Sequence, residues 1–164
     1  MNFELVEIPS LSGDCCQIFS ILIEGEEQTL FENFAEEYEE EYVDEIADMY
    51  NSLKFMGNEG SARPQFFKDK EGSPGDGVSA LYDHPDQMLR LYCIVYGRVA
   101  VILGGGGPKP KSIRAWQDDP KLCREATMMK YISSKITQAI KDGDIKITDA
   151  GLSGELKIID DYGD

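Results

Sequence analysis

The chain has few of the residues that bind metal ions, and its cysteines are not spaced as metal-binding pairs. The 164 residues hold a single histidine, His84, and four cysteines, none of them in a CxxC motif. So few ligands leave little material for a zinc site, and the cysteines lack the spacing of a secreted disulfide framework. We therefore expect no metal and no cofactor, and we interpret the cysteines as small buried apolar side chains.

Long apolar runs are also lacking. No segment is long enough to cross a membrane as a helix, and the N-terminus "MNFELVEIPS" has neither the basic nor the apolar region of a signal peptide. We therefore expect a cytoplasmic protein without a membrane partner. Hydrophobic residues make up 41% of the chain, which is enough to bury the core of one domain.

Positive charge is nearly absent from both ends of the sequence. Residues 1–62 carry sixteen acidic side chains and one lysine, whereas residues 63–147 carry fourteen basic and ten acidic side chains. Residues 148–164 carry five acidic and one basic, which completes the net charge of −15. A surface that attracts phosphate would therefore lie in the middle of the chain, and the acidic run "EEYEEEYVDE" is either a solvated face or a docking surface.

The spacing of apolar residues predicts an α+β fold. Alternating or continuous apolar runs predict strands over 3–8 and 16–24, and then an antiparallel meander of three strands over 78–105. Spacings of three and four predict amphipathic helix over 24–57, as one helix or two, and over 119–143. This order predicts an antiparallel sheet with an N-terminal helical hairpin and a C-terminal helix packed against it.

The predicted elements suggest one domain and a short C-terminal extension. The domain covers residues 1–143, and Asp119 and Gly143 mark the start and the end of its last helix as N-cap and terminating glycine. Residues 144–164 contain a predicted hairpin over 144–160 and an acidic tail. No internal repeat or long linker divides the chain further.

The run "VILGGGGPKPKS", residues 101–112, resembles a phosphate-binding loop only superficially. It fails as a P-loop, because Lys111 follows Pro110 where that motif requires glycine. It fails as a dinucleotide-binding loop because no βαβ unit follows, so we expect no nucleotide. We predict instead that Gly104–Gly107 end the third strand of the meander, either because the exit needs unusual φ angles or because another backbone passes close.

Two lysines follow these glycines in a segment that is stiffened by proline. Lys109 and Lys111 are two residues apart in an extended segment, so their side chains should point the same way. Arg90 and Tyr92 have the same spacing on the predicted second strand of the meander, and they should share one face of it. These four residues are the candidate site.

These residues occur within a longer pattern over about residues 53–140. The pattern consists of a helix end and glycine in "SLKFMG", a loop, the strands "VSALYD", "QMLRLYCIVYG" and "RVAVILGG", and a basic loop. It resembles the RelE/HigB-like family of toxins from toxin–antitoxin systems. Arg90 with Tyr92 matches the arginine-bearing strand of that family, and Lys109 with Lys111 matches its basic loop. The chain departs from the family pattern in four respects: "VSALYD" lacks an arginine, Pro110 splits the lysine pair, the chain is strongly acidic, and its last predicted hairpin has no counterpart in the pattern.

The resemblance implies a ribosome-dependent mRNA endonuclease that uses the RNA 2′-hydroxyl as its nucleophile, with an antitoxin protein as partner. Arg90, Lys109 and Lys111 would stabilise the charge that grows on the phosphate, and Tyr92 would stack on a base or transfer a proton. Other roles stay open for each residue. Arg90 equally fits a salt bridge to the acidic helices, Tyr92 fits packing within the sheet, and the lysines fit a solvated loop.

Three functional hypotheses follow, and they leave open whether the chain is an enzyme. The first is a RelE/HigB-like toxin that acts as an endoribonuclease on ribosome-bound mRNA. The second is a catalytically impaired relative that binds a partner protein through its sheet or acidic helices. The third is an unrelated, non-enzymatic interaction module whose acidic helices bind protein or mimic nucleic acid.

Overall fold

The computed structural model describes residues 1–68, 77–81, 87–109 and 119–160. The strands of its main sheet are β1 (Phe3–Glu7), β2 (Gln17–Ile23), β3 (Phe67–Lys68), β4 (Val78–Leu81), β5 (Leu89–Tyr96), β6 (Ala100–Pro108) and β9 (Lys157–Ile158). The helices are α1 (Leu30–Tyr38), α2 (Val43–Phe55) and α3 (Pro120–Lys141), and the short turns are η1 (Met56–Gly60) and η2 (Pro64–Phe66). The strands β7 (Ile145–Thr148) and β8 (Gly151–Gly154) form a separate hairpin.

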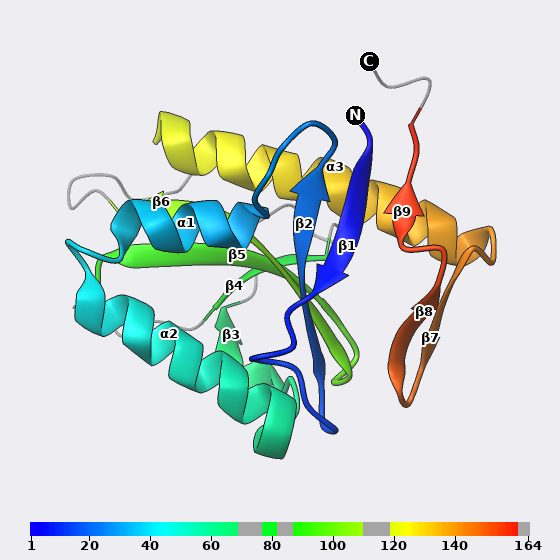
Figure 1. Cartoon of the computed structure of the whole chain (residues 1–164), viewed down its shortest axis with the longest axis horizontal. Helices are drawn as coiled ribbons and strands as arrows, with labels where there is room; N and C mark the ends of the chain where they lie inside the picture. Colours follow the sequence, from blue (N-terminus) through cyan, green and yellow to red (C-terminus); the bar gives the residue numbers. More distant parts are fainter. Residues whose placement is uncertain (69–76, 82–86, 110–118, 161–164) are drawn as a thin grey trace.

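The fold is mixed α+β, built on a seven-stranded and mostly antiparallel sheet. Its strand order is β3-β4-β5-β6-β2-β1-β9, and β2 with β6 is the one parallel pair between described strands. Helices α1 and α2 cover one face of the sheet, and α3 covers the other (Figure 1). Each face therefore has its own apolar core, because successive side chains of a strand point to opposite faces.

Local sequence signals explain where the helices begin and end. The stretch expected as one helix or two forms two, and α1 begins with a capping box in which Thr29 and Glu32 exchange side-chain-to-backbone hydrogen bonds. Asp119 caps α3 by accepting from the amide of Leu122, as the sequence predicts. No helix in the described part of the chain is long and apolar enough to cross a membrane.

The glycine tract lies inside a strand, so the prediction that it ends the strand was wrong. Strand β6 continues through Gly104–Gly107 to Pro108, and none of these glycines has a positive φ. Close packing explains the glycines: a Cβ at Gly104 would strike the sulfur of Met129 on α3, and a Cβ at Gly106 would strike the backbone carbonyl of Arg90. Of the two reasons foreseen for glycine, close approach applies and unusual φ does not.

The pairing between β2 and β6 ends where the glycine tract begins. Strand β2 pairs with β6 only as far as Ser20 and Leu103, and beyond that point α1 lies along the glycine half of β6 (Figure 1). The buried Ser20 hydroxyl donates to the Leu103 carbonyl at 2.8 Å and accepts from the amide of Phe31 at 3.1 Å. One serine thus joins β2, β6 and the first turn of α1.

The C-terminal segment returns to the main sheet after its hairpin. The β7–β8 hairpin follows α3 and projects at the right of Figure 1, and β9 then pairs antiparallel with β1. The amide of Leu152 in β8 donates to the Gln17 side chain of β2 at 2.7 Å, so the hairpin also contacts the main sheet.

Candidate functional site

Two of the predicted site residues lie at one end of the sheet. Arg90 pairs with Gly107 across β5 and β6, and the Lys109 amide donates to the Met88 carbonyl at 2.7 Å just beyond. Strand alternation therefore places Arg90 and Lys109 on the same face, the one that α3 covers. Both residues are half-buried, and the Nε of Arg90 is fully buried. Lys111 lies outside the described residues.

Tyr92 lies on the same strand face but inside the protein. Its ring is fully buried in the core between the sheet and α3. Strands β5 and β6 shift register between Leu91 and Cys93, so that Gly104 and Gly105 together oppose this tyrosine. The position agrees with the packing alternative for Tyr92. A role in base stacking stays a prediction, and it would require the ring to become exposed.

Sequence reasoning missed two residues at this end, both in the first turns of α3. Lys121 lies beside Gly107, and its Nζ is 2.9 Å from a carboxylate oxygen of Glu37 and 5.0 Å from the centre of the Tyr38 ring on α1. Glu125 lies one turn further along, beside Gly105, and burial raises the pKa of its carboxyl group. Their spacing of four on a predicted helix was the available signal.

We call Arg90, Lys109 and Lys121 the basic end of the sheet. Three cations near one another attract an anion, and a carboxyl group with a raised pKa keeps its proton to a higher pH than an ordinary glutamate, as a general acid requires. However, Glu37 and Glu125 both interact with Lys121, and their charges offset most of the positive charge. The basic end can therefore contact a phosphate, but it provides little long-range attraction for RNA.

A second surface combines acidic and apolar side chains on the outer sides of α1 and α2. Exposed apolar side chains at Val43, Ala47 and Tyr50 recur at helical spacing on α2, and Val43 is 63% exposed. Seven exposed carboxylates lie on α1, on α2 or in the turn between them: Glu32, Glu36, Glu39, Glu40, Glu41, Asp44 and Asp48. We call the strip and these carboxylates the acidic helical face.

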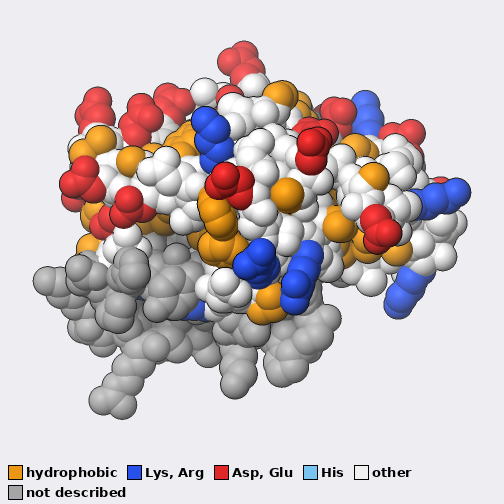
Figure 2. All heavy atoms as spheres, turned by 90° about the horizontal axis from the view of Figure 1, so that it is seen from below, with side chains coloured by type: hydrophobic (Ala, Val, Ile, Leu, Met, Phe, Trp, Pro, Cys, Tyr) orange, Lys and Arg blue, Asp and Glu red, His pale blue; other side chains and the backbone are white. Residues whose placement is uncertain are grey.

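Tyr50 connects the apolar strip to α1. Its ring centre is 5.4 Å from that of Phe31, and burial together with the charges of Glu39 and Glu32 raises the pKa of the Tyr50 hydroxyl. Carboxylates of α1 therefore lie within electrostatic range of the strip. Figure 2 shows acidic side chains gathered at the upper left, over α1 and α2, whereas lysines and arginines are scattered singly or in pairs.

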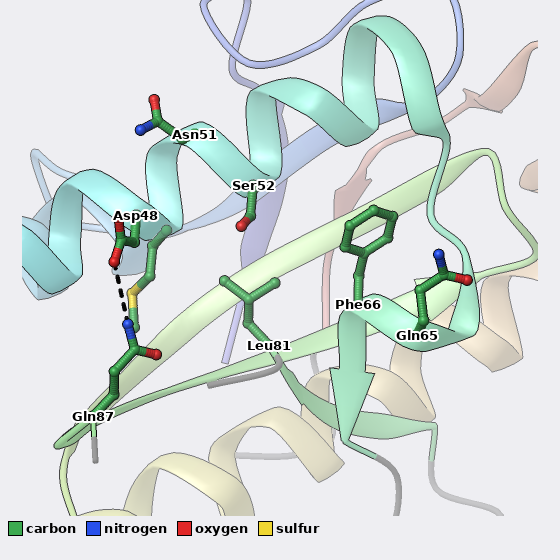
Figure 3. A pocket seen from close by; sticks show the side chains of 8 residues that line it. Asp48, Asn51, Ser52, Gln65, Phe66, Leu81 and Gln87 are labelled. Atoms are coloured by element: carbon green, nitrogen blue, oxygen red, sulfur yellow. Dashed lines mark hydrogen bonds between the residues drawn. The ribbon is translucent and has the colours of Figure 1, made fainter. Parts of the chain in front are cut away.

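A pocket of about 350 Å³ opens on the other flank of α2. Its walls come from α2, η2, the end of β4 and Gln87, which precedes β5, as Figure 3 shows. The Gln87 side-chain amide donates to the Asp48 carboxylate across its mouth at 3.3 Å. The lining residues are Asp48, Met49, Asn51, Ser52, Gln65, Phe66, Leu81 and Gln87.

Neither metal chemistry nor a known relative identifies the site. Across residues 1–68, 77–81, 87–109 and 119–160, no three His, Cys, Asp or Glu side chains are grouped to hold a metal ion. No family model, curated protein or solved structure matches the chain. The function must therefore be inferred from the geometry of the basic end, the acidic helical face and the pocket.

Proposed function

We propose that this protein is an interaction module whose acidic helical face binds a basic, amphipathic helix of a partner protein. The observation that carries the proposal is the apolar strip of Val43, Ala47 and Tyr50 with carboxylates around it. A helix that only faces solvent needs no apolar side chains at this spacing. An amphipathic partner helix would cover them with its own apolar residues.

The charge of the acidic helical face determines the chemistry of the partner. Within the described residues, none of its seven carboxylates forms an ion pair, whereas the neighbouring Glu37 pairs with Lys121. A basic helix that binds here would reduce the repulsion among the seven carboxylates. Its positive charge would also be attracted at long range, which speeds association. Apolar contact with the strip then supplies affinity that salt does not screen.

A designed peptide tests this proposal directly. The probe is an 18-residue helix with leucines along one face and lysines elsewhere, and its matched control carries glutamate at every lysine position. Fluorescence anisotropy with the full chain should show saturable binding of the lysine peptide only. Val43→Ser with Tyr50→Ser should weaken this binding, whereas Ile147→Ser, at an exposed apolar position in β7, should not.

Charge-matched variants separate docking from general attraction to an acidic protein. Glu36→Gln, Glu40→Gln and Asp44→Asn remove three charges from the acidic helical face. Glu4→Gln, Glu7→Gln and Asp149→Asn remove three exposed charges elsewhere. The first set should weaken binding much more than the second. Equal losses from the two sets would show that the peptide responds only to the net charge.

A second candidate function rests on the placement of Arg90 and Lys109 at the same end of the sheet. It is the RelE/HigB-like endoribonuclease, with α1 and α2 as that family's helical hairpin, ribosome-bound mRNA as substrate and an antitoxin as partner. Lys121 would add a third cation, and Glu125 would transfer protons. The offsetting charges of Glu37 and Glu125 favour a catalytically impaired relative instead.

Expression in a bacterial host distinguishes the two functions. We expect little or no slowing of growth, because Glu37 and Glu125 offset two of the three positive charges of the basic end. The purified chain should likewise show no measurable binding to unstructured RNA at physiological salt. Strong growth arrest that Arg90→Ala relieves would instead support the endoribonuclease.

A further inference from the structure

The pocket beside α2 combines several hydrogen-bond acceptors with one aromatic and two aliphatic side chains. Asp48 supplies a carboxylate, Ser52 a hydroxyl, and Asn51, Gln65 and Gln87 supply amide oxygens. Phe66, Met49 and Leu81 supply the apolar surface, and among its described lining residues no side chain is positively charged. Figure 3 shows the Phe66 ring standing between the polar groups of α2 and Gln65.

Hydrogen-bond acceptors beside an aromatic ring favour a guanidinium group over other cations. A guanidinium group is planar, carries five N–H donors and stacks on aromatic rings, so acceptors at its edge and a ring at its face both suit it. A carboxylate or phosphate would instead meet Asp48 and would be repelled. The volume of about 350 Å³ is at the lower end for ligand pockets and accommodates a guanidinium group with its alkyl stem.

The Asp48 carboxylate is already placed for such a contact. Its present partner is the neutral amide of Gln87, at the long distance of 3.3 Å. A guanidinium group would replace this contact with a charge-assisted bond, which is shorter and stronger.

We propose that this pocket binds the guanidinium group of an arginine side chain from the partner's basic segment. The inference rests on the proposed function, because Asp48 belongs to the acidic helical face as well as to the pocket. A helix docked on that face would need only one arginine at its edge to reach the pocket. The arginine would add specificity to a surface that otherwise attracts any cation.

Small amino-acid derivatives test the pocket without the partner. The probe is Nα-acetyl-arginine amide, and the neutral control is the citrulline derivative, in which an oxygen replaces one guanidinium nitrogen. Titrated into the full ¹⁵N-labelled chain, the arginine compound should shift the amide signals of Asp48, Gln65, Phe66 and Gln87 saturably. The citrulline derivative should not, because it lacks the charge that Asp48 would pair with.

Two charge-removing variants locate the binding. Asp48→Asn keeps the shape of the pocket and should weaken arginine binding by about fivefold or more, as expected for loss of a charge-assisted bond. Glu59→Gln removes an exposed charge from η1, which directly follows α2, and should have little effect. Unchanged affinity in Asp48→Asn, or equal binding of the citrulline or lysine derivative, would overturn the proposal.

The outcomes also separate this inference from the proposed function. The designed helical peptide contains lysine and no arginine. If it binds the acidic helical face while the arginine compound fails to bind, the pocket assignment is wrong and the interaction module stands. If the arginine compound binds and the peptide does not, the module is wrong, and the pocket recognises guanidinium compounds by itself.

Discussion

Gly106 in β6 lies against the backbone carbonyl of Arg90 in β5, so closely that any Cβ at this position would overlap it. The contact occurs beside the register shift between the two strands. The bulge adds a residue on β6 and brings the two backbones together, which only glycine permits. The same contact positions Arg90 opposite Gly107 at the basic end of the sheet.

Alanine substitutions in the glycine tract should therefore lower the free energy of unfolding by very different amounts. Gly106→Ala should destabilise most, because the strand backbone cannot yield. Gly104→Ala should cost about 1–3 kcal/mol, because its methyl group would displace the buried Met129 side chain. Gly105→Ala should destabilise least of the three, since its methyl group meets only the end of the Glu125 side chain, at 2.7 Å, and a long side chain can change rotamer.

Urea denaturation of the three variants measures this order. The midpoints should fall from Gly105→Ala through Gly104→Ala to Gly106→Ala at a constant m-value. Equal midpoints would mean that the glycines do not serve close packing. Gly104→Ala should lower the midpoint less in a Met129→Ala background than in the wild type, because the two substitutions affect the same space.

Ser20→Ala should destabilise the chain by about 1–3 kcal/mol, because it leaves the buried Phe31 amide and Leu103 carbonyl without their hydrogen-bond partner. Ser134→Ala is the matched control. That hydroxyl is exposed and bonds only to the Tyr131 carbonyl. Thermal unfolding should show a lower midpoint for Ser20→Ala than for Ser134→Ala or the wild type. Equal midpoints of the two variants would show that the hydrogen bonds of Ser20 do not stabilise the fold.

Local patterns were sufficient to predict most elements of the fold. The apolar spacing in 119–143 and the capping residue Asp119 predicted α3, and apolar alternation predicted the meander of β4, β5 and β6. Each of these signals operates within a few residues of the chain. The division of 24–57 into α1 and α2 was one of two alternatives, because "EEYEEEY" is compatible with continuous helix.

Features that depend on distant contacts were not predictable in the same way. The parallel pairing of β2 with β6 joins segments about eighty residues apart, and no short motif encodes it. The glycine tract was misinterpreted because its reason lies in Met129, on a helix that follows later in the sequence. Lys121 and Glu125 join the candidate site only because α3 packs across β6, so sequence spacing alone could not place them there.

Thiol labelling should divide the four cysteines into two pairs. Cys16 and Cys93 are buried, and burial raises the pKa of both thiols, that of Cys16 to about 12. Cys15 and Cys123 are partly exposed. A disulfide reagent at pH 8 should therefore modify Cys15 and Cys123 in the native chain and the other two only after unfolding. Rapid modification of all four would contradict the packing of Cys16 and Cys93.

The partly buried carboxyl group of Glu125 should make stability depend on pH. Burial raises its pKa from the ordinary 4.5, so the folded chain binds this proton more tightly than the unfolded chain does. The resulting penalty is absent well below pH 4.5, grows as the pH rises through the raised value, and is complete above it. Glu125→Gln should therefore be more stable than the wild type near pH 7, and this advantage should shrink as the pH falls.

Removing any negative charge from a protein of net charge −15 also reduces self-repulsion, so a matched control is needed. Glu36→Gln removes the same charge from an exposed position on α1. Urea midpoints of both variants should be measured between pH 4 and pH 8. The gain from Glu125→Gln should exceed that from Glu36→Gln at pH 7, and the difference should vanish toward pH 4. A difference that is constant across this range would show that burial of the Glu125 charge does not destabilise the fold.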